Sequence, residues 1–357
     1  MKFRKLLIIA GVVFCLLLLA VVKNIIGKRS ESITTKESTV INLIKGLSEG
    51  FVSKIIVYKG SDDKNKMSLR KGLFGKWTLE NRFGLKARPE AVNSLLKELA
   101  DVSGEIRADS KELFEDFGIS DVSGVHVILK SGNDKVMKHI VLGVKRPAWN
   151  MNFVRSAGDE LVIAVQKDIL SRLNLYDASS KLDENYFADF KVFSLDTDQV
   201  DRLEVKEAEK QELVFVKKPA DKAMPAGWNL KPSVKGRDID TAKIDGFLQN
   251  ITNIYAQDVL DPALNTYGFD RPSLEINLFT PLEKQSSLSG FTPQDGSQPI
   301  HLIVGSYLEP QKAYFLRVIL QGTRGMVYRV PESFIQNLKK ERSFFLKEKD
   351  TKDPKKK

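Results

Sequence analysis

The sequence contains the same succession of motifs twice, about 150 residues apart, and this duplication limits the fold more than any single motif. An alternating apolar run at Val52–Val57 matches Val200–Val205 at an offset of 148 residues. In each copy a second apolar run follows, so both pairs predict a β-hairpin. Trp77 and Trp228 come next, at an offset of 151 residues. We therefore expect two tandem units of one fold.

An amphipathic helix and a glycine turn follow in both copies. Val92–Leu99 and Ile244–Ile251 place apolar residues at i, i+3, i+4 and i+7, which gives each helix one buried face. An aromatic residue and a glycine then predict a tight turn, with positive φ at the glycine. An apolar strand ending in glycine follows, and a closing helix ends each copy. The recurring structural positions are Trp77 and Trp228, Phe117 and Tyr267, Gly118 and Gly268, and Gly143 and Gly305.

We predict that each unit is α+β, with antiparallel β-hairpins covered by short helices. The expected divisions are a membrane anchor with basic flanks (1–28), a tether (29–48), the first unit (49–190), the second unit (191–346) and a basic disordered tail (347–357). The second copy has an insertion of 13 residues within 281–299, where a Ser/Gly/Pro/Gln-rich composition is typical of a surface loop. A long helical pattern is expected to cross between the units.

The N-terminus predicts a transmembrane helix. Residues 6–22 form a run of 17 residues without a charge, and extension to Ile26 gives a helix of about 31 Å, close to the hydrocarbon thickness of about 30 Å. A cleaved signal peptide is the alternative, but its apolar region is only about 7–15 residues and ends in a small-residue site that is missing here. The anchor residues are Leu6, Leu7, Ile8, Ile9, Val12, Val13, Phe14, Leu16, Leu17, Leu18, Leu19, Val21 and Val22.

The orientation of this anchor is not decided by charge, since three basic residues lie on each side of it. We expect a single-pass protein of the bacterial cytoplasmic membrane with its body on the extracytoplasmic side. The single cysteine, Cys15, lies in the anchor, so a disulfide framework and a multi-cysteine metal site are excluded.

The net charge of +10 belongs to the two ends of the chain. Residues 1–30 carry +6 and residues 347–357 carry +3, which leaves +1 for the body. A nucleic-acid-binding domain would carry its basic charge on the folded body, so we expect no nucleic-acid partner. The basic tail reads as a solvated end, with contact to anionic lipid or an acidic partner as the alternative.

No residue pattern predicts catalysis, a metal or a cofactor. The phosphate-loop, dinucleotide, nucleophile-elbow and zinc-protease motifs are absent from the sequence. His126 is expected on a solvent-facing strand face, while His139 and His301 occupy matching places in separate units. Glu112, Glu115 and Asp116 form an acidic group that reads as a solvated helix face, although an acidic rim with Asp258 and Asp261 stays open. We predict a protein without enzymatic activity.

Trp149 is the candidate partner contact. It lies in the loop Lys145–Asn150 next to Arg146, and the second copy has no equivalent tryptophan. An aromatic side chain in a loop flanked by basic residues is typical of a protein contact, although it can also fold back onto the core. Tyr307, in the corresponding segment Ser306–Pro310, completes the candidate set. Trp77 and Trp228 are read as core residues rather than as the lining of a ligand groove, because they recur in both units.

The order of these motifs resembles the bacterial domain-of-unknown-function 4340 family. The resemblance covers roughly residues 50–345, and Tyr267–Pro272 is its clearest signature; the first copy keeps only Phe117–Ile119 and lacks the proline. It implies a single-pass envelope protein that accompanies ABC-type transporters of the gliding-motility type. No catalytic residues are established for the family. We therefore expect a non-enzymatic accessory or scaffold protein, or alternatively an extracytoplasmic module that binds a lipid or an envelope polymer in an apolar groove between sheet and helix.

Overall fold

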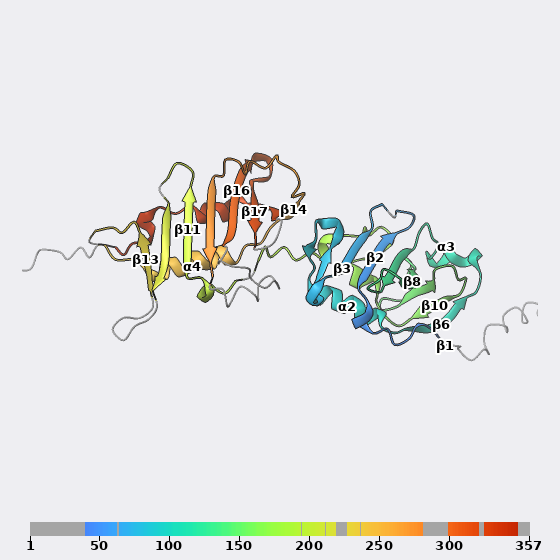
Figure 1. The fold of residues 1–357 in the computed structure, drawn as a ribbon. Helices are drawn as coiled ribbons and strands as arrows, with labels where there is room; N and C mark the ends of the chain where they lie inside the picture. Colours follow the sequence, from blue (N-terminus) through green and yellow to red (C-terminus); the bar gives the residue numbers. More distant parts are fainter. Residues whose placement is uncertain are drawn as a thin grey trace, which may run out of the picture.

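The computed structural model describes residues 40–348, apart from 63, 194, 211, 219–226, 236, 281–298 and 321–324. It consists of two units that follow one another along the chain, each built on one antiparallel sheet (Figure 1). The predicted anchor (6–22), the predicted insertion loop and residues 349–357 of the predicted tail lie outside the described residues.

The first sheet has ten strands in the order β1-β6-β10-β9-β8-β7-β2-β3-β4-β5. Two α-helices belong to this unit, α2 (Pro89–Leu99) and α3 (Phe114–Phe117). The strands are β1 (Val40–Ile44), β2 (Lys54–Lys59), β3 (Met67–Lys71), β4 (Trp77–Leu79), β5 (Leu85–Lys86), β6 (Val102–Ala108), β7 (Val125–Lys130), β8 (Val136–Leu142), β9 (Asn152–Ser156) and β10 (Val162–Val165).

The second sheet has eight strands in the order β13-β12-β11-β15-β16-β17-β18-β14. Its helices are α4 (Thr241–Thr252) and α6 (Glu332–Leu338). The strands are β11 (Arg202–Glu207), β12 (Leu213–Lys218), β13 (Gly227–Lys231), β14 (Asp258–Leu260), β15 (Leu274–Phe279), β16 (Ile300–Leu308), β17 (Ala313–Ile319) and β18 (Met326–Pro331).

The two sheets share one topology. The first sheet, followed from β4 through β3, β2, β7, β8, β9 and β10 to β6, has the same chain order as the second sheet from β13 to β14. The first sheet differs by one extra strand at each end, β1 and β5. Because the sequence offsets pair the same elements, the duplicated sequence corresponds to a duplicated sheet.

The strands of these sheets alternate between residues that face the core and residues that face away from it. In β15, Leu274, Ile276 and Leu278 are fully buried, while the residues between them are half-buried. Helix α2 buries Val92, Leu95, Leu96 and Leu99 against the first sheet, as its 3.6-residue period requires. Most buried residues of both units form one continuous core, and a smaller separate cluster in the first unit contains Ala108, Phe114, Ile119, Val141 and Val162.

The predicted α+β class is wrong, since the protein is mainly β. The described α-helices are short, and the expected crossing helix is replaced by 3₁₀ turns at η5 (Leu170–Leu173), η6 (Glu184–Tyr186) and η7 (Thr197–Gln199). Asn174 ends η5 in the left-handed conformation at φ 59°, so the apolar spacing before it does not continue into a helix. Residues 40–44, assigned to the tether, form β1 and pair with β6. No helix within the described ranges is long and apolar enough to cross a membrane.

The segment between the units hydrogen-bonds to both of them. Ala188 bridges to Ala87 of the first unit, and Lys191 bridges to Tyr255 of the second. A side-chain contact reinforces the junction, because Arg82 pairs with Asp258, which also accepts an ion pair from Arg329 at 3.3 Å. The two sheets are thus joined through backbone and side chains.

Candidate functional site

Trp149 lies at the surface, on the loop between β8 and β9. Its side chain is 78% exposed, the highest value among the large exposed apolar residues of the described chain. Short backbone bonds close the loop, since Gly143 N–H donates to Phe153 O at 2.9 Å and Met151 N–H donates to Ala148 O at 3.2 Å. The indole therefore does not fold back onto the core.

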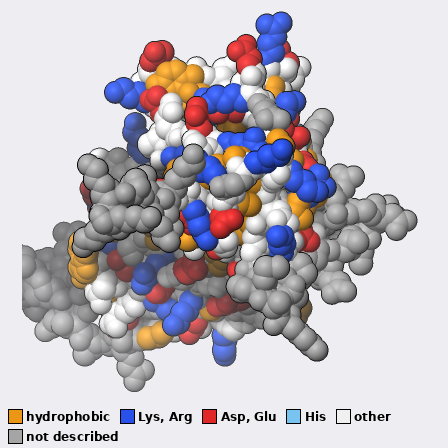
Figure 2. Space-filling model, turned by 90° about the vertical axis from the view of Figure 1, so that its left-hand side faces the viewer, with side chains coloured by type: hydrophobic (Ala, Val, Ile, Leu, Met, Phe, Trp, Pro, Cys, Tyr) orange, Lys and Arg blue, Asp and Glu red, His pale blue; other side chains and the backbone are white. Residues whose placement is uncertain are grey.

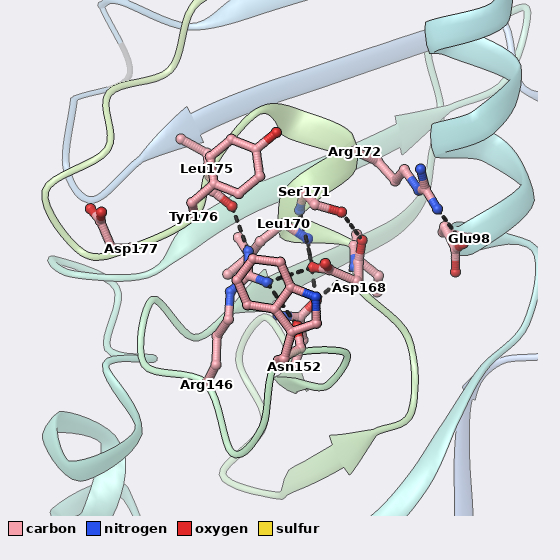
Figure 3. Close-up of polar contacts among 12 residues, drawn as sticks. Glu98, Arg146, Asn152, Asp168, Leu170, Ser171, Arg172, Leu175, Tyr176 and Asp177 are labelled. Atoms are coloured by element: carbon pink, nitrogen blue, oxygen red, sulfur yellow. Dashed lines mark hydrogen bonds and ion pairs between the residues drawn. The ribbon is translucent and has the colours of Figure 1, made fainter.

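Arg146 holds the loop in place (Figure 3). Its guanidinium donates to the carbonyl of Trp149 at 3.2 Å, to the carboxylate of Asp168 at 2.7 Å and to the carbonyl of Leu175 at 2.5 Å. The side chain is only 11% exposed. Arg146 is thus bonded within the protein and holds the segment that carries Trp149, while its role as a partner contact stays a prediction.

Asp168 and Asn152 fix the segment against which the loop packs. Asp168 accepts from the N–H of Ser171 at 3.2 Å while it pairs with Arg146. The buried amide oxygen of Asn152 accepts from the N–H groups of Ile169 and Leu170 at 2.7 and 3.2 Å. These bonds satisfy the first N–H groups of η5 and connect β9 to it.

Tyr176 is a second exposed aromatic residue, and sequence reasoning missed it. It follows Leu175 directly and is 52% exposed. Its turn is tied by the hydroxyl of Ser180, which accepts from Tyr176 N–H at 3.2 Å, and by Lys59, which donates to the Ser180 carbonyl at 2.7 Å. Because Arg146 bonds both Leu175 and Trp149, one guanidinium sets the segments that carry both aromatics. The nearest signal in the sequence, a lone tyrosine after an apolar run, does not distinguish it from other loop tyrosines.

Tyr307 lies elsewhere and is engaged internally. It belongs to the second sheet, in β16, which continues to Leu308 where a loop was expected. Its hydroxyl donates to Glu332 Oε2 at 2.9 Å, and this bond raises the pKa of Tyr307 to about 12. Its ring lies 4.9 Å from that of Tyr314. The structure thus places Tyr307 in the other unit from Trp149, with a hydrogen bond and a ring contact of its own.

The recurring residues form the same turn in both units. Gly118 and Gly268 have φ of 59° and 72°. A Cβ placed on Gly143 would lie 2.5 Å from Phe117 O, and one on Gly305 would overlap Tyr267 O in the same way. The rings of Phe117 and Phe153 lie 4.6 Å apart, and those of the equivalent Tyr267 and Phe315 lie 4.7 Å apart. Trp77 and Trp228 are each only 6% exposed.

The histidines differ from expectation at one position. His126 is 4% exposed, so the prediction of a solvent-facing side chain is wrong. Its ring stacks on Tyr58 at 4.5 Å, and its Nδ1 lies 3.1 Å from Nε2 of His139. Burial lowers the pKa of both histidines. In the second unit the equivalent pair is Glu275 and His301, 3.3 Å apart. The difference arises because side chains of the two neighbouring strands, Tyr58 of β2 and His139 of β8, pack against His126 on this face of the sheet.

The acidic residues considered in the sequence are exposed or make contacts of their own. Glu112, Glu115 and Asp116 are exposed. Asp258 pairs with Arg82 and Arg329, while Asp261 caps its own turn by accepting from Ala263 N–H at 2.8 Å. Within the described part of the chain, no group of three or more His, Cys, Asp or Glu side chains is arranged to hold a metal ion.

A mostly apolar cavity of about 550 Å³ lies between the two units. Leu85 and Lys86 contribute from the first sheet, Val192 from the linker, and Val318 and Met326 from the second sheet. Tyr328 also lines it, and burial together with the charge of Asp189 raises the pKa of Tyr328 to about 12. An apolar groove was expected between a sheet and a helix, whereas this cavity lies between the two units.

Comparison with known proteins gives one family. A family model described as a domain of unknown function, DUF4340, matches residues 77–272, which is more than half of the chain. The match begins at Trp77 and ends at Pro272, so it includes the first unit from β4 and the signature turn of the second. No curated protein and no solved structure matches the chain. The chain therefore belongs to the DUF4340 family.

Proposed function

We propose that this protein is a non-enzymatic accessory or scaffold protein of the bacterial envelope, associated with an ABC-type transport system. Its apolar segment 6–22 anchors it in the cytoplasmic membrane as a single helix, and its body lies on the extracytoplasmic side. The length of the apolar run and its basic flanks support the anchor. The transporter association rests on the family resemblance.

The observation that carries the contact role is the exposure of Trp149 on a fixed loop. Its side chain is 78% exposed, while Arg146 beneath it is only 11% exposed and bonds three acceptors. Exposed tryptophan and tyrosine side chains contribute most of the binding energy in many interfaces. A loop that is already ordered loses little conformational entropy on binding. Trp149 and Tyr176 together therefore favour a protein partner.

The proposal is tested by cross-linking from the loop itself. A photoreactive amino acid at position 149 of the full-length protein, in its native membrane, is expected to form reproducible links to an envelope protein. The matched control carries the same amino acid at Phe51, which is 71% exposed in the same unit. Links to a transporter subunit from position 149 and not from position 51 would support the proposal. Equal links from both positions, or none from 149, would refute the contact role.

A second candidate function is lipid or envelope-polymer binding, which the cavity between the units favours. Its volume of about 550 Å³ and its apolar walls suit a small apolar ligand. Native mass spectrometry of the full-length protein is expected to show a copurifying lipid that Met326→Trp, which fills the cavity from its half-buried rim, removes. Val122→Trp, at a position 70% exposed, is the matched control. A protein without bound lipid, or lipid retained in Met326→Trp, would reject this alternative.

A further inference from the structure

Each unit ends in the same short two-stranded ribbon. In the first unit Ala87 bridges to Ala188, and in the second unit Ile239 bridges to Leu346. Two backbone hydrogen bonds flank each bridge in the same pattern. They are Arg88 N to Phe187 O (2.7 Å) and Asp189 N to Lys86 O (2.8 Å), and Asp240 N to Phe345 O (2.9 Å) and Lys347 N to Asp238 O (2.9 Å).

The two ribbons differ in how they meet their sheets. In the first unit, β5 pairs with β4, and Ala87 N–H donates to Trp77 O at 2.9 Å, so ribbon and sheet are continuous. In the second unit, β13 takes the place of β4, and none of the described residues pairs with its outer edge. A groove of about 350 Å³ separates β13 from the ribbon. Its walls include Trp228, Asn229, Leu230, Asp238 and Ile239.

Both walls of this groove direct backbone groups into it. Lys217 N–H donates to Asp201 O at 2.8 Å, toward β11, so its neighbour Val216 bonds across to Asn229 of β13. Trp228 and Leu230 therefore direct their N–H and C=O groups away from β12, into the groove. On the other wall, Asp238 and Asp240 carry the ribbon bonds, which leaves the backbone of Ile239 facing β13. An open strand edge of this kind accepts an added strand.

The positive charge of the groove favours an occupant with negative charge. Among the described residues, its charged walls are formed by Lys218, Arg237 and Lys347 and by one acid, Asp238. Arg237 donates to Lys347 O at 2.8 Å, and its buried Nε has no hydrogen-bond partner among the described residues. Figure 2 views the molecule from this end and shows Lys and Arg side chains spread over it, with Asp and Glu side chains among them. An acidic segment would offset this charge.

We infer that an extended, acidic segment of a partner protein binds in this groove as an added strand between β13 and the ribbon. Its backbone pairs with Trp228 and Leu230 on one side and with Ile239 on the other, whereas in the first unit the ribbon strand, which continues β5, pairs with β4 directly. This inference deepens the proposed scaffold function and rests on it for the biological role of the partner. The groove lies in the second unit, apart from the Trp149 loop, so the two contacts are tested separately.

The test uses the full chain in detergent and a labelled nine-residue peptide in which Val and Thr alternate with Glu. A peptide with Lys in place of Glu is the charge control. The acidic peptide is expected to bind, to slow amide hydrogen exchange at Trp228, Leu230 and Ile239, and to leave the Trp149 loop unchanged. Arg237→Glu is expected to weaken binding at least tenfold, because it reverses a charge in the groove.

A backbone variant separates strand addition from charge attraction. Ile239→Pro removes the N–H that faces β13 but leaves the ribbon bonds of Asp240 and Lys347 intact, whereas Ile239→Ala removes only side-chain atoms. We expect Ile239→Pro to bind about fivefold more weakly than Ile239→Ala, as the loss of one hydrogen bond predicts. Equal binding of acidic and basic peptides, or no protection of the three amides at millimolar peptide, would overturn the inference. Failure of cross-linking at position 149 with protection in the groove would instead reject only the Trp149 contact.

Discussion

The guanidinium of Arg146 and the carboxylate of Asp168 form an ion pair of 2.7 Å beneath the loop that carries Trp149. Both side chains are less than one-fifth exposed, at 11% and 19%. A pair this well shielded resists screening by salt better than a surface pair does. The position of the indole thus depends on a contact that lies beneath the exposed surface of the loop.

Replacement of Asp168 by Asn tests this dependence. The amide keeps the acceptor for Ser171 N–H but removes the charge opposite Arg146, so we expect a loss of about 2 kcal/mol in the free energy of unfolding. Cross-linking from position 149 should fall in parallel. Urea denaturation and the cross-linking yield measure the two effects. Glu160→Gln, which breaks the exposed pair with Lys111, should change neither; equal losses in both variants would contradict the role of the buried pair.

Substitution of Gly143 or Gly305 by Ala should destabilise its own unit. The added methyl group would overlap the carbonyl oxygen of Phe117 or Tyr267, and a backbone atom cannot move aside as a flexible side chain does. We expect a loss of about 1–3 kcal/mol in each variant, measured by chemical denaturation. Gly132→Ala is the control, because nothing lies within 4 Å of its added Cβ. Wild-type stability of Gly143→Ala would show that the turn relaxes freely.

The stability of the first unit should fall as the pH drops below about 6.5. Burial lowers the folded-state pKa of His126 and His139, so the unfolded chain binds more protons than the folded chain in this range. The groups that face the pair are Tyr58, Asp121 and Arg155. The slope is at most about 1.4 kcal/mol per pH unit for each histidine.

His139→Gln should flatten this slope between pH 6.5 and 5 in urea denaturation, since it removes one titrating ring. A separate loss is expected at lower pH from Glu80. Its burial opposes ionisation, but hydrogen bonds from Lys54, Ser68 and Arg70 outweigh burial and lower its pKa to about 2. That contribution is complete above about pH 4.5 and is lost as the pH falls toward 2. An unchanged slope in His139→Gln above pH 5 would exclude the histidine pair as its source.

Asp258→Ala should loosen the junction between the units. It leaves Arg82 and Arg329 facing each other without the carboxylate that pairs with both. We expect the single calorimetric transition that a continuous core supports to split in two, with faster hydrogen exchange in residues 188–192. Lys206→Ala, which removes an exposed pair with Glu275, is the control. One unchanged transition in Asp258→Ala would mean that the backbone bonds and the shared core hold the units together without this ion pair.

The duplication was the part of the fold most open to prediction, because it depends on comparing the sequence with itself. Trp77 and Trp228 and the glycines at 143 and 305 mark equivalent places in sheets of equal topology. The fold class was predicted wrongly because short edge strands show little alternation of apolar and polar residues. β5 has two residues and β14 has three, and their pairing depends on segments far away in sequence.

The candidate site was predicted in part. The exposure of Trp149 could be expected from a loop tryptophan without an equivalent tryptophan in the other copy. The burial of Arg146 could not, because its acceptors, Asp168 and Leu175, lie 22 and 29 residues further along the chain. The burial of His126 could not be predicted for the same reason. Alternation along the strand indicates the face on which His126 lies, but the ring of Tyr58 that covers it comes from a separate strand.

Residues 187–192 serve both units at once, and this has a practical consequence for dividing the protein. Phe187 and Asp189 complete the ribbon of the first unit, whereas Phe190 and Val192 bond to Ala256 and Ile254 of the second. The boundary expected at 190/191 falls inside this shared segment. A truncation on either side of it would strip one unit of its last backbone partner and leave a bare strand edge open to aggregation. Neither unit can be expressed alone without cutting this shared segment. The two units together are therefore the smallest part of the chain that we expect to fold.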